Sequence, residues 1–128
     1  LDENGHVNNV AYVAWMQDAA IAHAEVTGGT AATRAAGCTW VARSHRIEYL
    51  RPAFEGDRIE VRTWIGDLRR AGSLRRYRFV RLDDGVELAR GATDWVFVDA
   101  DSGRPKRLPE TVTAVFDVVG DQEDPAQG

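Results

Sequence analysis

Near its start the chain carries a long apolar segment without glycine or proline. From Asn8 to Thr27 it is rich in alanine, with valine, tyrosine, tryptophan, methionine and isoleucine, and it stops at Gly28-Gly29. This pattern predicts one helix of about five turns. Asn8 and Asn9 supply its cap, because an asparagine side chain accepts hydrogen bonds from the free amides of a first turn.

The predicted helix is apolar around most of its circumference. At about 100° per residue, Asp18 and Glu25 fall on one narrow stripe with Ala11 and Ala14, and nearly all other positions are apolar. A helix of this kind is enclosed, so we expect the rest of the chain to wrap around it. The side chains expected to contact a sheet are Val10, Val13, Ala20, Ile21 and Ala24.

Four segments after the helix have the composition of β-strands. They are rich in β-branched and aromatic residues, and glycine, proline or aspartate separates them. In the second segment Ile59 and Val61 alternate with Glu60 and Arg62, which predicts a sheet with one buried face. The Asp-Gly pair at positions 84 and 85 predicts a hairpin. The predicted strands are Thr39 to Leu50, Asp57 to Asp67, Ser73 to Leu82 and Val86 to Asp99.

The order of these elements predicts the fold class. After the strands, Val112, Val115, Phe116 and Val119 have helical spacing, and residues 120–128 have the composition of an acidic tail. We expect residues 1–119 to form one α+β domain, in which a curled antiparallel sheet wraps one long central helix. This is the layout of a hotdog fold. A complete version has a further strand ahead of the helix, of which this sequence contains only Leu1.

Composition narrows the class of protein. The 128 residues fit one domain, and a net charge of -4 argues against binding to nucleic acid. Cys38 is the only cysteine, and His6, His23 and His45 lack a second ligand at metal spacing, so we expect no metal and no cofactor. No apolar run is long enough to span a membrane, and no signal peptide is visible. These features predict a cytoplasmic protein, in which Cys38 is a small buried or half-buried side chain.

The candidate chemistry lies just ahead of the helix. Residues 2–9 read Asp-Glu-Asn-Gly-His-Val-Asn-Asn, so a carboxylate, an amide and an imidazole lie beside the free amides of a helix start. Such amides can face a developing oxyanion, the glycine permits a close backbone approach, and the carboxylate can activate water or attack directly. The candidate catalytic residues are Asp2, Asn4, His6 and Asn9.

This segment resembles the thioesterases of the hotdog superfamily, in particular the 4-hydroxybenzoyl-CoA thioesterase-like branch. The matching residues are Asp2, Gly5, His6, Val7, Asn8, Asn9 and Tyr12, and residues 47–53 with 56–57 resemble the second signature of that branch. The resemblance implies hydrolysis of an acyl-CoA to a free acid and coenzyme A without a cofactor. It also implies that Asp2 is the nucleophile or general base, and that the backbone N–H of Asn9 polarises the thioester carbonyl.

Three other functions stay open. Asp2, Asn4 and His6 also match the D-x-N-x-H-V-N-N pattern of acyl-ACP thioesterases, in which all three side chains serve catalysis, although those enzymes are usually double hotdogs. Hydratases of the superfamily also pair an aspartate with a histidine. They have a proline where this chain has Gly5, however, and this difference argues against hydratase activity. A hotdog can also bind acyl-CoA without catalysis, but a binding module has no need of a carboxylate at the thioester. His6 either orients the loop or transfers a proton.

The remaining candidates concern substrate binding and assembly. We expect the acyl group to lie along the helix near Tyr12, Trp15 and Met16, and Gly5 to bind the substrate through a close backbone approach. The arginines between Arg69 and Arg81, Arg75 and Arg76 among them, either form a solvated hairpin or meet the phosphates of coenzyme A or an acidic carrier protein. The resemblance implies a homodimer or homotetramer, in which a neighbouring subunit completes each site.

Overall fold

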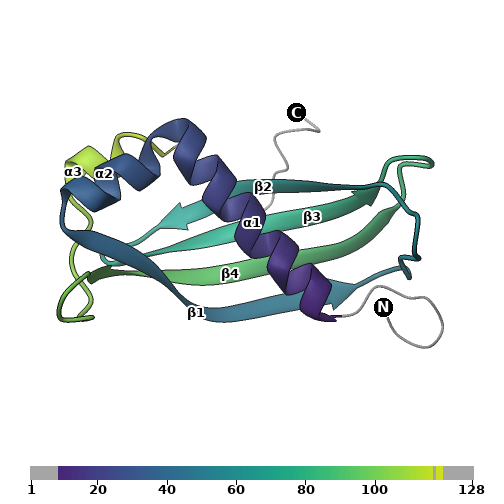
Figure 1. Ribbon diagram of the computed structural model, residues 1–128, viewed down its shortest axis with the longest axis horizontal. Coiled ribbons are helices and arrows are strands. Elements are labelled where there is room, and N and C mark those ends of the chain that lie inside the picture. The colour runs from purple at the N-terminus through teal and green to yellow at the C-terminus, as the bar shows by residue number, and fades with distance from the viewer. Residues whose placement is uncertain (1–8, 117, 120–128) are drawn as a thin grey trace.

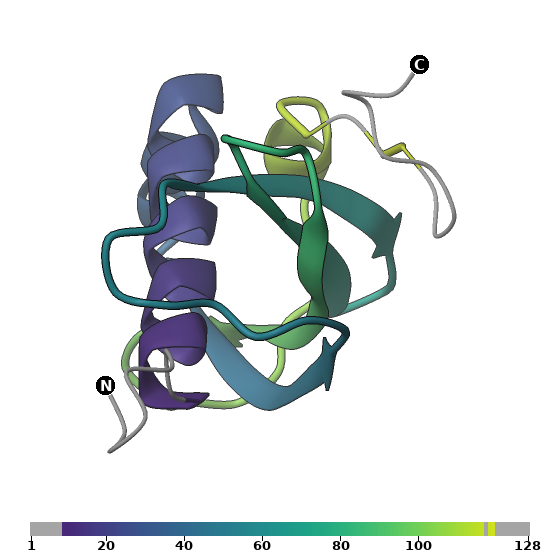
Figure 2. The same cartoon turned by 90° about the vertical axis from the view of Figure 1, so that its right-hand side faces the viewer.

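One long helix lies across one face of an antiparallel sheet in the computed structural model, which describes residues 9–116, 118 and 119. Figure 1 shows this helix, α1 (Asn9–Thr27), crossing the four strands. The strands are β1 (Cys38–Tyr49), β2 (Ile59–Leu68), β3 (Gly72–Arg81) and β4 (Glu87–Asp99), in the order β1-β4-β3-β2. The sheet curls so that α1 lies on its concave side (Figure 2). The predicted α+β hotdog architecture is confirmed.

The strand predictions are confirmed to within two residues at every boundary. The alternation predicted for β2 is also confirmed, because Ile59 and Val61 pack against the core while Arg62 lies opposite Arg78 on the outer face. The hairpin at positions 84 and 85 joins β3 to β4. Gly85 has a φ of 71°, a left-handed conformation that glycine adopts without strain.

The face of α1 that contacts the sheet differs from the predicted one. Tyr12, Met16 and Ala20 are buried at intervals of four residues, as one stripe of a helix requires. Val10 is 77% exposed and Ile21 is 54% exposed, so the prediction was wrong for these two side chains. A helix that is apolar almost all round does not reveal which stripe faces the sheet, whereas the concave sheet accommodates the larger side chains at positions 12 and 16.

A second helix follows α1 without being predicted. Gly28 has a φ of 88° and ends α1, but the chain turns helical again in α2 (Gly29–Ala35). The alanines of this segment favour helix, and the two glycines concealed it in the sequence. Gly29 packs closely on Phe116: a methyl group at position 29 would lie 2.4 Å from Cζ of Phe116, so the ring would have to shift.

The segment after β4 only partly follows its predicted helical spacing. Helix α3 (Glu110–Thr113) is short and buries Val112 completely. The prediction of helical structure through Val119 was wrong, because the N–H of Val119 donates to the carbonyl of Ile65 at 2.9 Å and Val118 forms a parallel bridge to β2. An open strand edge satisfies these backbone groups better than a longer helix would.

Two hydrophobic clusters hold the fold together. The larger lies between α1 and the sheet and includes Met16, Phe79 and Leu88, all with no exposed surface. The smaller joins the start of β1 to α3 through Cys38, Phe97 and Val112. Cys38 is a free, buried thiol, as predicted. α2 and α3 lie together at the end of the sheet where α1 ends (Figure 1).

Candidate active site

The proposed catalytic residues Asp2, Asn4 and His6, together with Gly5, lie outside the described residues. Asn9 is the first described residue and lies in α1, so the described part of the helix begins shortly after those residues in the sequence. The surroundings of this helix end are described, and they come from three parts of the chain: the first two turns of α1, the loop between β1 and β2, and the hairpin between β3 and β4.

Tyr12 is the centre of an aromatic cluster at the start of α1. Its ring makes edge contacts with Trp15, Tyr49 and Phe79, with centroid distances of 5.3, 5.3 and 4.9 Å. Burial raises the pKa of the Tyr12 hydroxyl above its ordinary value of 10.0, and Tyr49 and Asp57 nearby raise it further. The hydroxyl is therefore protonated at neutral pH and can donate a hydrogen bond, but it cannot act as a base there.

The contact between Tyr12 and Tyr49 brings together the two segments that the sequence analysis singled out. The first includes Tyr12, and the second runs from position 47 to position 57. They are far apart along the chain, but the end of β1 and the following loop lie beside the first turns of α1. The second segment therefore belongs to the surroundings of the candidate site.

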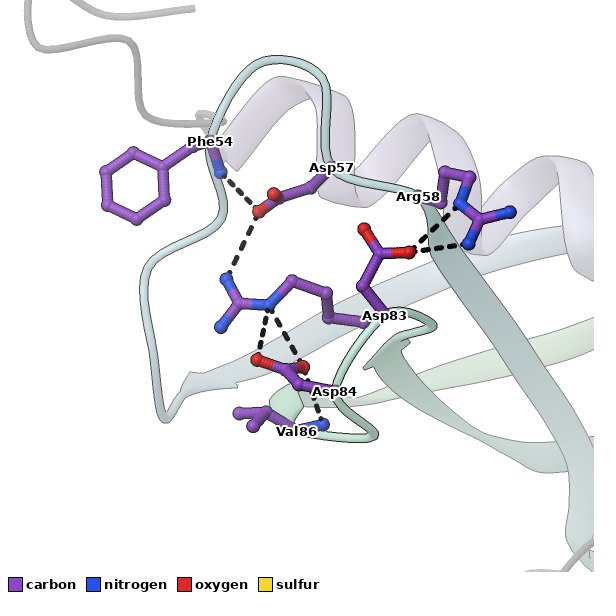
Figure 3. A network of polar contacts seen from close by, with 7 residues as sticks. Phe54, Asp57, Arg58, Asp83, Asp84 and Val86 are labelled. Carbon is purple, nitrogen blue, oxygen red and sulfur yellow. Dashed lines mark hydrogen bonds and ion pairs between the residues drawn. The ribbon is translucent and has the colours of Figure 1, made fainter.

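Asp57 holds the loop between β1 and β2 in shape. Figure 3 shows its carboxylate accepting a hydrogen bond from the backbone N–H of Phe54 at 2.9 Å. The same oxygen lies 3.2 Å from Nη1 of Arg81, whose Nε donates to the carboxylate of Asp84. A hydrogen bond from the N–H of Val86 lowers the pKa of Asp84, with the Arg81 contact adding to the effect.

Arg58 and Asp83 make a second link between the same loop and the hairpin, with Nη2 of the arginine 2.5 Å from the carboxylate (Figure 3). Both side chains are exposed, so this ion pair contributes little to the free energy of unfolding. Its effect is geometric, because together with the Asp57 network it ties the loop to the hairpin.

A hollow of about 360 Å³ opens between this loop and α1. Trp15 forms one wall, and Ile59 and Val61 of β2 form the floor. Phe54, Glu55, Gly56 and Asp57 complete the lining. An apolar hollow with a carboxylate at its edge is suited to an apolar group that carries a polar end.

A larger hollow, of about 460 Å³, lies under the other half of α1. Ala20, Ala24 and Ile65 line it together with Trp95 and the buried side chain of Arg75. Met16, fully buried between Tyr12 and Ala20, lies in the core between the two hollows rather than on the wall of either.

Arg75 and Arg76 point to opposite faces of β3, so the arginine cluster is not one surface. Arg75 is only 5% exposed, and it donates hydrogen bonds to Nδ1 of His23 at 2.9 Å and to the hydroxyl of Thr63 at 3.1 Å. Burial lowers the pKa of its guanidinium. The alternative that Arg75 belongs to a solvated hairpin is therefore wrong. Arg76 lies on the outer face, opposite Trp64 of β2.

The outer face of the sheet is rich in arginine around Arg76. Arg62, Arg78 and Arg90 are cross-strand neighbours in one row. Glu60 contacts Arg62, and Glu87 contacts both Arg78 and Arg90. The acidic side chains thus neutralise part of this face.

Sequence reasoning missed two polar contacts that lie on the face of the sheet covered by α1. His23 accepts the hydrogen bond from Arg75, and Nδ1 of His45 lies 2.9 Å from the hydroxyl of Thr93. Arg75, Thr93 and His45 occupy one row across β3, β4 and β1. The register of the strands creates this row, and no local sequence signal shows it.

Neither a metal centre nor a membrane-spanning helix is visible in the residues that the structure describes. Across 9–116, 118 and 119, no three His, Cys, Asp or Glu side chains are grouped so that they could hold a metal ion. In the same part of the chain, no helix is both long enough and apolar enough to cross a membrane.

Comparison with protein families shows to which superfamily the chain belongs. The model of the thioesterase-like superfamily matches residues 1–116, so the chain belongs to that superfamily. It is 31% identical over 100 residues to a chloroplastic palmitoyl-acyl carrier protein thioesterase from Arabidopsis thaliana. That match covers 74% of this chain but only 21% of the plant protein, so the chain spans about a fifth of that relative.

Solved structures with the same fold include thioesterases. A thioesterase from Thermus thermophilus, complexed with coenzyme A and Zn, is 26% identical with a TM-score of 0.74, and the match covers 91% of this chain and 82% of that one. The probable thioesterase YbaW from Escherichia coli has a TM-score of 0.82 at 20% identity, covering 90% and 86%. An acyl-ACP thioesterase from Bacteroides thetaiotaomicron has a TM-score of 0.84 at 21% identity, covering 98% and 50%.

Proposed function

We propose that this protein is a thioesterase that hydrolyses an acyl-CoA to a free acid and coenzyme A. The observation that carries the proposal is the superfamily match over residues 1–116, which includes the whole Asp2-to-Asn9 segment at the start of α1. The thioesterase of Thermus thermophilus, complexed with coenzyme A and Zn, supports coenzyme A as the thiol.

In the proposed reaction, Asp2 acts as general base or as nucleophile. As a base it takes a proton from water, the water oxygen forms a bond to the thioester carbon, and the C–S bond breaks to release coenzyme A as a thiolate that is then protonated. The amides at the start of α1, that of Asn9 in particular, stabilise the oxyanion that forms on the carbonyl. His6 orients the loop or transfers a proton, and Asn4 assists.

The described residues support a place for the acyl group beside α1. The hollow next to Trp15 opens beside the first turns of the helix, which follow the Asp2-to-Asn9 segment in the sequence, and its walls are largely apolar. Tyr12 lies one turn from the helix start and shapes this region through its aromatic contacts. Met16 supports the same region from the core. Gly5 gives the backbone room to approach the substrate.

Arg76 is proposed to attract the phosphorylated end of coenzyme A. It lies on the outer face of the sheet beside the arginine row of Arg62, Arg78 and Arg90. A guanidinium is suited to phosphate because its N–H groups form a planar fork.

A second candidate substrate is an acyl carrier protein thioester. The relative from Arabidopsis thaliana is a palmitoyl-acyl carrier protein thioesterase, and Asn4 and His6 fit the pattern of such enzymes. In this alternative the arginines of the outer face would meet an acidic carrier protein instead of a nucleotide. A non-catalytic acyl-CoA binding module is the third possibility.

We further infer that the active unit is a homodimer or homotetramer in the cytoplasm, with residues 1–119 as its domain. β1 is an edge strand of twelve residues, and it exposes the apolar side chains of Val41 and Tyr49. A long edge with exposed apolar side chains favours pairing with a second copy. Sedimentation velocity tests this assembly, and a monomer at all concentrations would contradict it.

Release of free thiol from matched substrates tests the proposed activity. Purified protein is given acyl-CoA and acyl-carrier-protein thioesters with the same acyl groups, covering aromatic, short and long aliphatic chains. Faster release from the CoA series supports the proposal, and faster release from the carrier-protein series supports the alternative. If the protein binds acyl-CoA but releases no thiol from any substrate, the result would support the non-catalytic binding module.

A further inference from the structure

Arg75 is a buried cation without an acidic partner in the described part of the chain. No carboxylate oxygen of residues 9–116, 118 and 119 forms an ion pair with it. Its Nη1 donates to His23 and Thr63, while its Nε and Nη2 have no acceptor among the same residues. Because a guanidinium has five N–H donors and no acceptor, three of its donors have no protein acceptor among the described residues.

These donors belong to a side chain that lines the 460 Å³ hollow under the second half of α1. Trp95 lines the same hollow, and its Nε1–H and the neighbouring hydroxyl of Tyr77 are both buried without a hydrogen bond of normal geometry among the described residues. Ala20, Ala24 and Ile65 contribute apolar surface to the walls, and Thr30, Thr33, Thr39 and Ser73 contribute polar groups. A charge removed from water is costly unless a partner of opposite charge accompanies it.

The hollow is thus lined by a buried positive charge and by apolar side chains. We propose that it is a binding site for an organic carboxylate with an apolar body, whose carboxylate pairs with Arg75. A carboxylate accepts two parallel hydrogen bonds from the fork of a guanidinium, and the apolar body fills the space between α1 and the sheet.

Two other charged side chains line this hollow, and neither neutralises the charge of Arg75. Glu25 and Arg34 are exposed, and Glu25 makes no ion pair with Arg75 in the described residues. Glu25 lies on the solvent side of α1, so its charge is screened by water, whereas that of Arg75 is not. Arg34 adds positive charge at the rim.

The carboxylate has two possible sources, which differ in how they relate to the proposed thioesterase activity. One is a free fatty acid. The other is the far end of an acyl group that carries a second carboxylate. α1 rises about 1.5 Å per residue, so Asn9 and His23 are separated by about 21 Å along its axis. An acyl chain with its thioester at the helix start must therefore be long to reach Arg75.

Binding of octanoate tests the site without requiring any catalysis. Calorimetric titration should show saturable binding of octanoate to the wild-type protein, and at least about tenfold weaker binding of octan-1-ol and octylammonium. Arg75→Met should lower the affinity for octanoate by about tenfold or more. The variant should then bind octanoate no more tightly than octan-1-ol. Arg76→Met, at the adjacent position on the opposite face of β3, is the matched control and should leave the octanoate affinity unchanged.

Two further variants keep the test decisive if Arg75→Met does not fold. Arg75→Lys retains the charge but loses the fork, and Trp95→Phe retains the ring but loses the buried N–H. Each variant should lower the affinity for octanoate by about threefold or more and leave the affinity for octan-1-ol unchanged. Equal binding of octanoate and octan-1-ol, or an octanoate affinity that none of these substitutions at positions 75 and 95 changes, would overturn the site.

Hydrolysis assays then assign the source of the carboxylate. If it is the end of the acyl group, wild-type protein should prefer hexadecanedioyl-CoA over hexadecanoyl-CoA by about tenfold in kcat/KM, and Arg75→Met should lose that preference. If it is a free fatty acid, octanoate should inhibit hydrolysis of hexadecanoyl-CoA by the wild type but not by Arg75→Met. Absence of all hydrolysis would refute the proposed function, while the octanoate titrations would still decide the site.

Discussion

The sulfur of Met16 packs directly on the backbone of β4 at Gly91, where a methyl group would lie only 2.9 Å from it. Met16 has no exposed surface, and it occupies the middle of the buried stripe of α1. Glycine inside a strand often marks a close approach of this kind. The pair therefore sets how closely the helix sits on the centre of the sheet.

Truncation of Met16 should destabilise the protein strongly. Met16→Ala removes a fully buried side chain and leaves a cavity against Gly91, so we expect a loss of about 2–5 kcal/mol in the free energy of unfolding, measured by urea denaturation. Ile21→Ala is the matched control on the same helix. Since Ile21 is 54% exposed, its truncation should cost less than about 1 kcal/mol. Equal losses would contradict the helix orientation described above.

Substitution of Asp2 tests the proposed chemistry. Asp2→Asn keeps the shape of the side chain but removes the base or nucleophile, so kcat for thioester hydrolysis should fall by about a hundredfold or more. Asp18→Asn, which changes an exposed carboxylate of α1, should leave kcat unchanged. Near-native turnover by Asp2→Asn would show that another group carries the reaction.

Glu87 should make the free energy of unfolding depend on pH in the acidic range. Its burial alone would raise the pKa of its carboxyl, but hydrogen bonds from Arg90 and Arg78 outweigh this and hold the pKa below its ordinary value of 4.5. A depressed pKa in the folded state stabilises the protein above the unfolded pKa, and this contribution is lost as the pH falls through the folded value.

Comparison of Glu87→Gln with the wild type measures this contribution. The wild type should be the more stable at about pH 7, and the difference should shrink between about pH 5 and lower values as Glu87 is protonated. Glu55→Gln is the control, because Glu55 is exposed and makes no ion pair among the described residues. A difference that stays constant with pH would disprove the role of the Arg78 and Arg90 contacts.

Charge reversal of Arg76 tests the proposed contact with the phosphorylated end of coenzyme A. Arg76→Glu should raise KM for acyl-CoA, more at low ionic strength, because exposed charges are screened within about 8–10 Å at physiological salt. kcat should change little, since the group is remote from the thioester. A short acyl thioester without the nucleotide is the control substrate, and an equal rise in its KM would argue against phosphate binding by Arg76.

The sequence alone determined the architecture, because the signals for it are local. Apolar residues without glycine or proline from Asn8 to Thr27 specify a long helix, and period-two alternation such as that from Ile59 to Arg62 specifies strands with one buried face. The segment ahead of α1 likewise identified the superfamily, since its residues are adjacent in the chain.

Only the tertiary structure decided which groups meet across the sheet. Arg69 to Arg81 reads as one basic segment, but the pleat of β3 turns Arg75 inward to His23 and Arg76 outward. The stripe of α1 that faces the sheet was undetermined for a related reason, because an almost uniformly apolar helix can be buried on several sides. Strand register and the curl of the sheet resolved both, and they depend on contacts between residues that are distant in sequence.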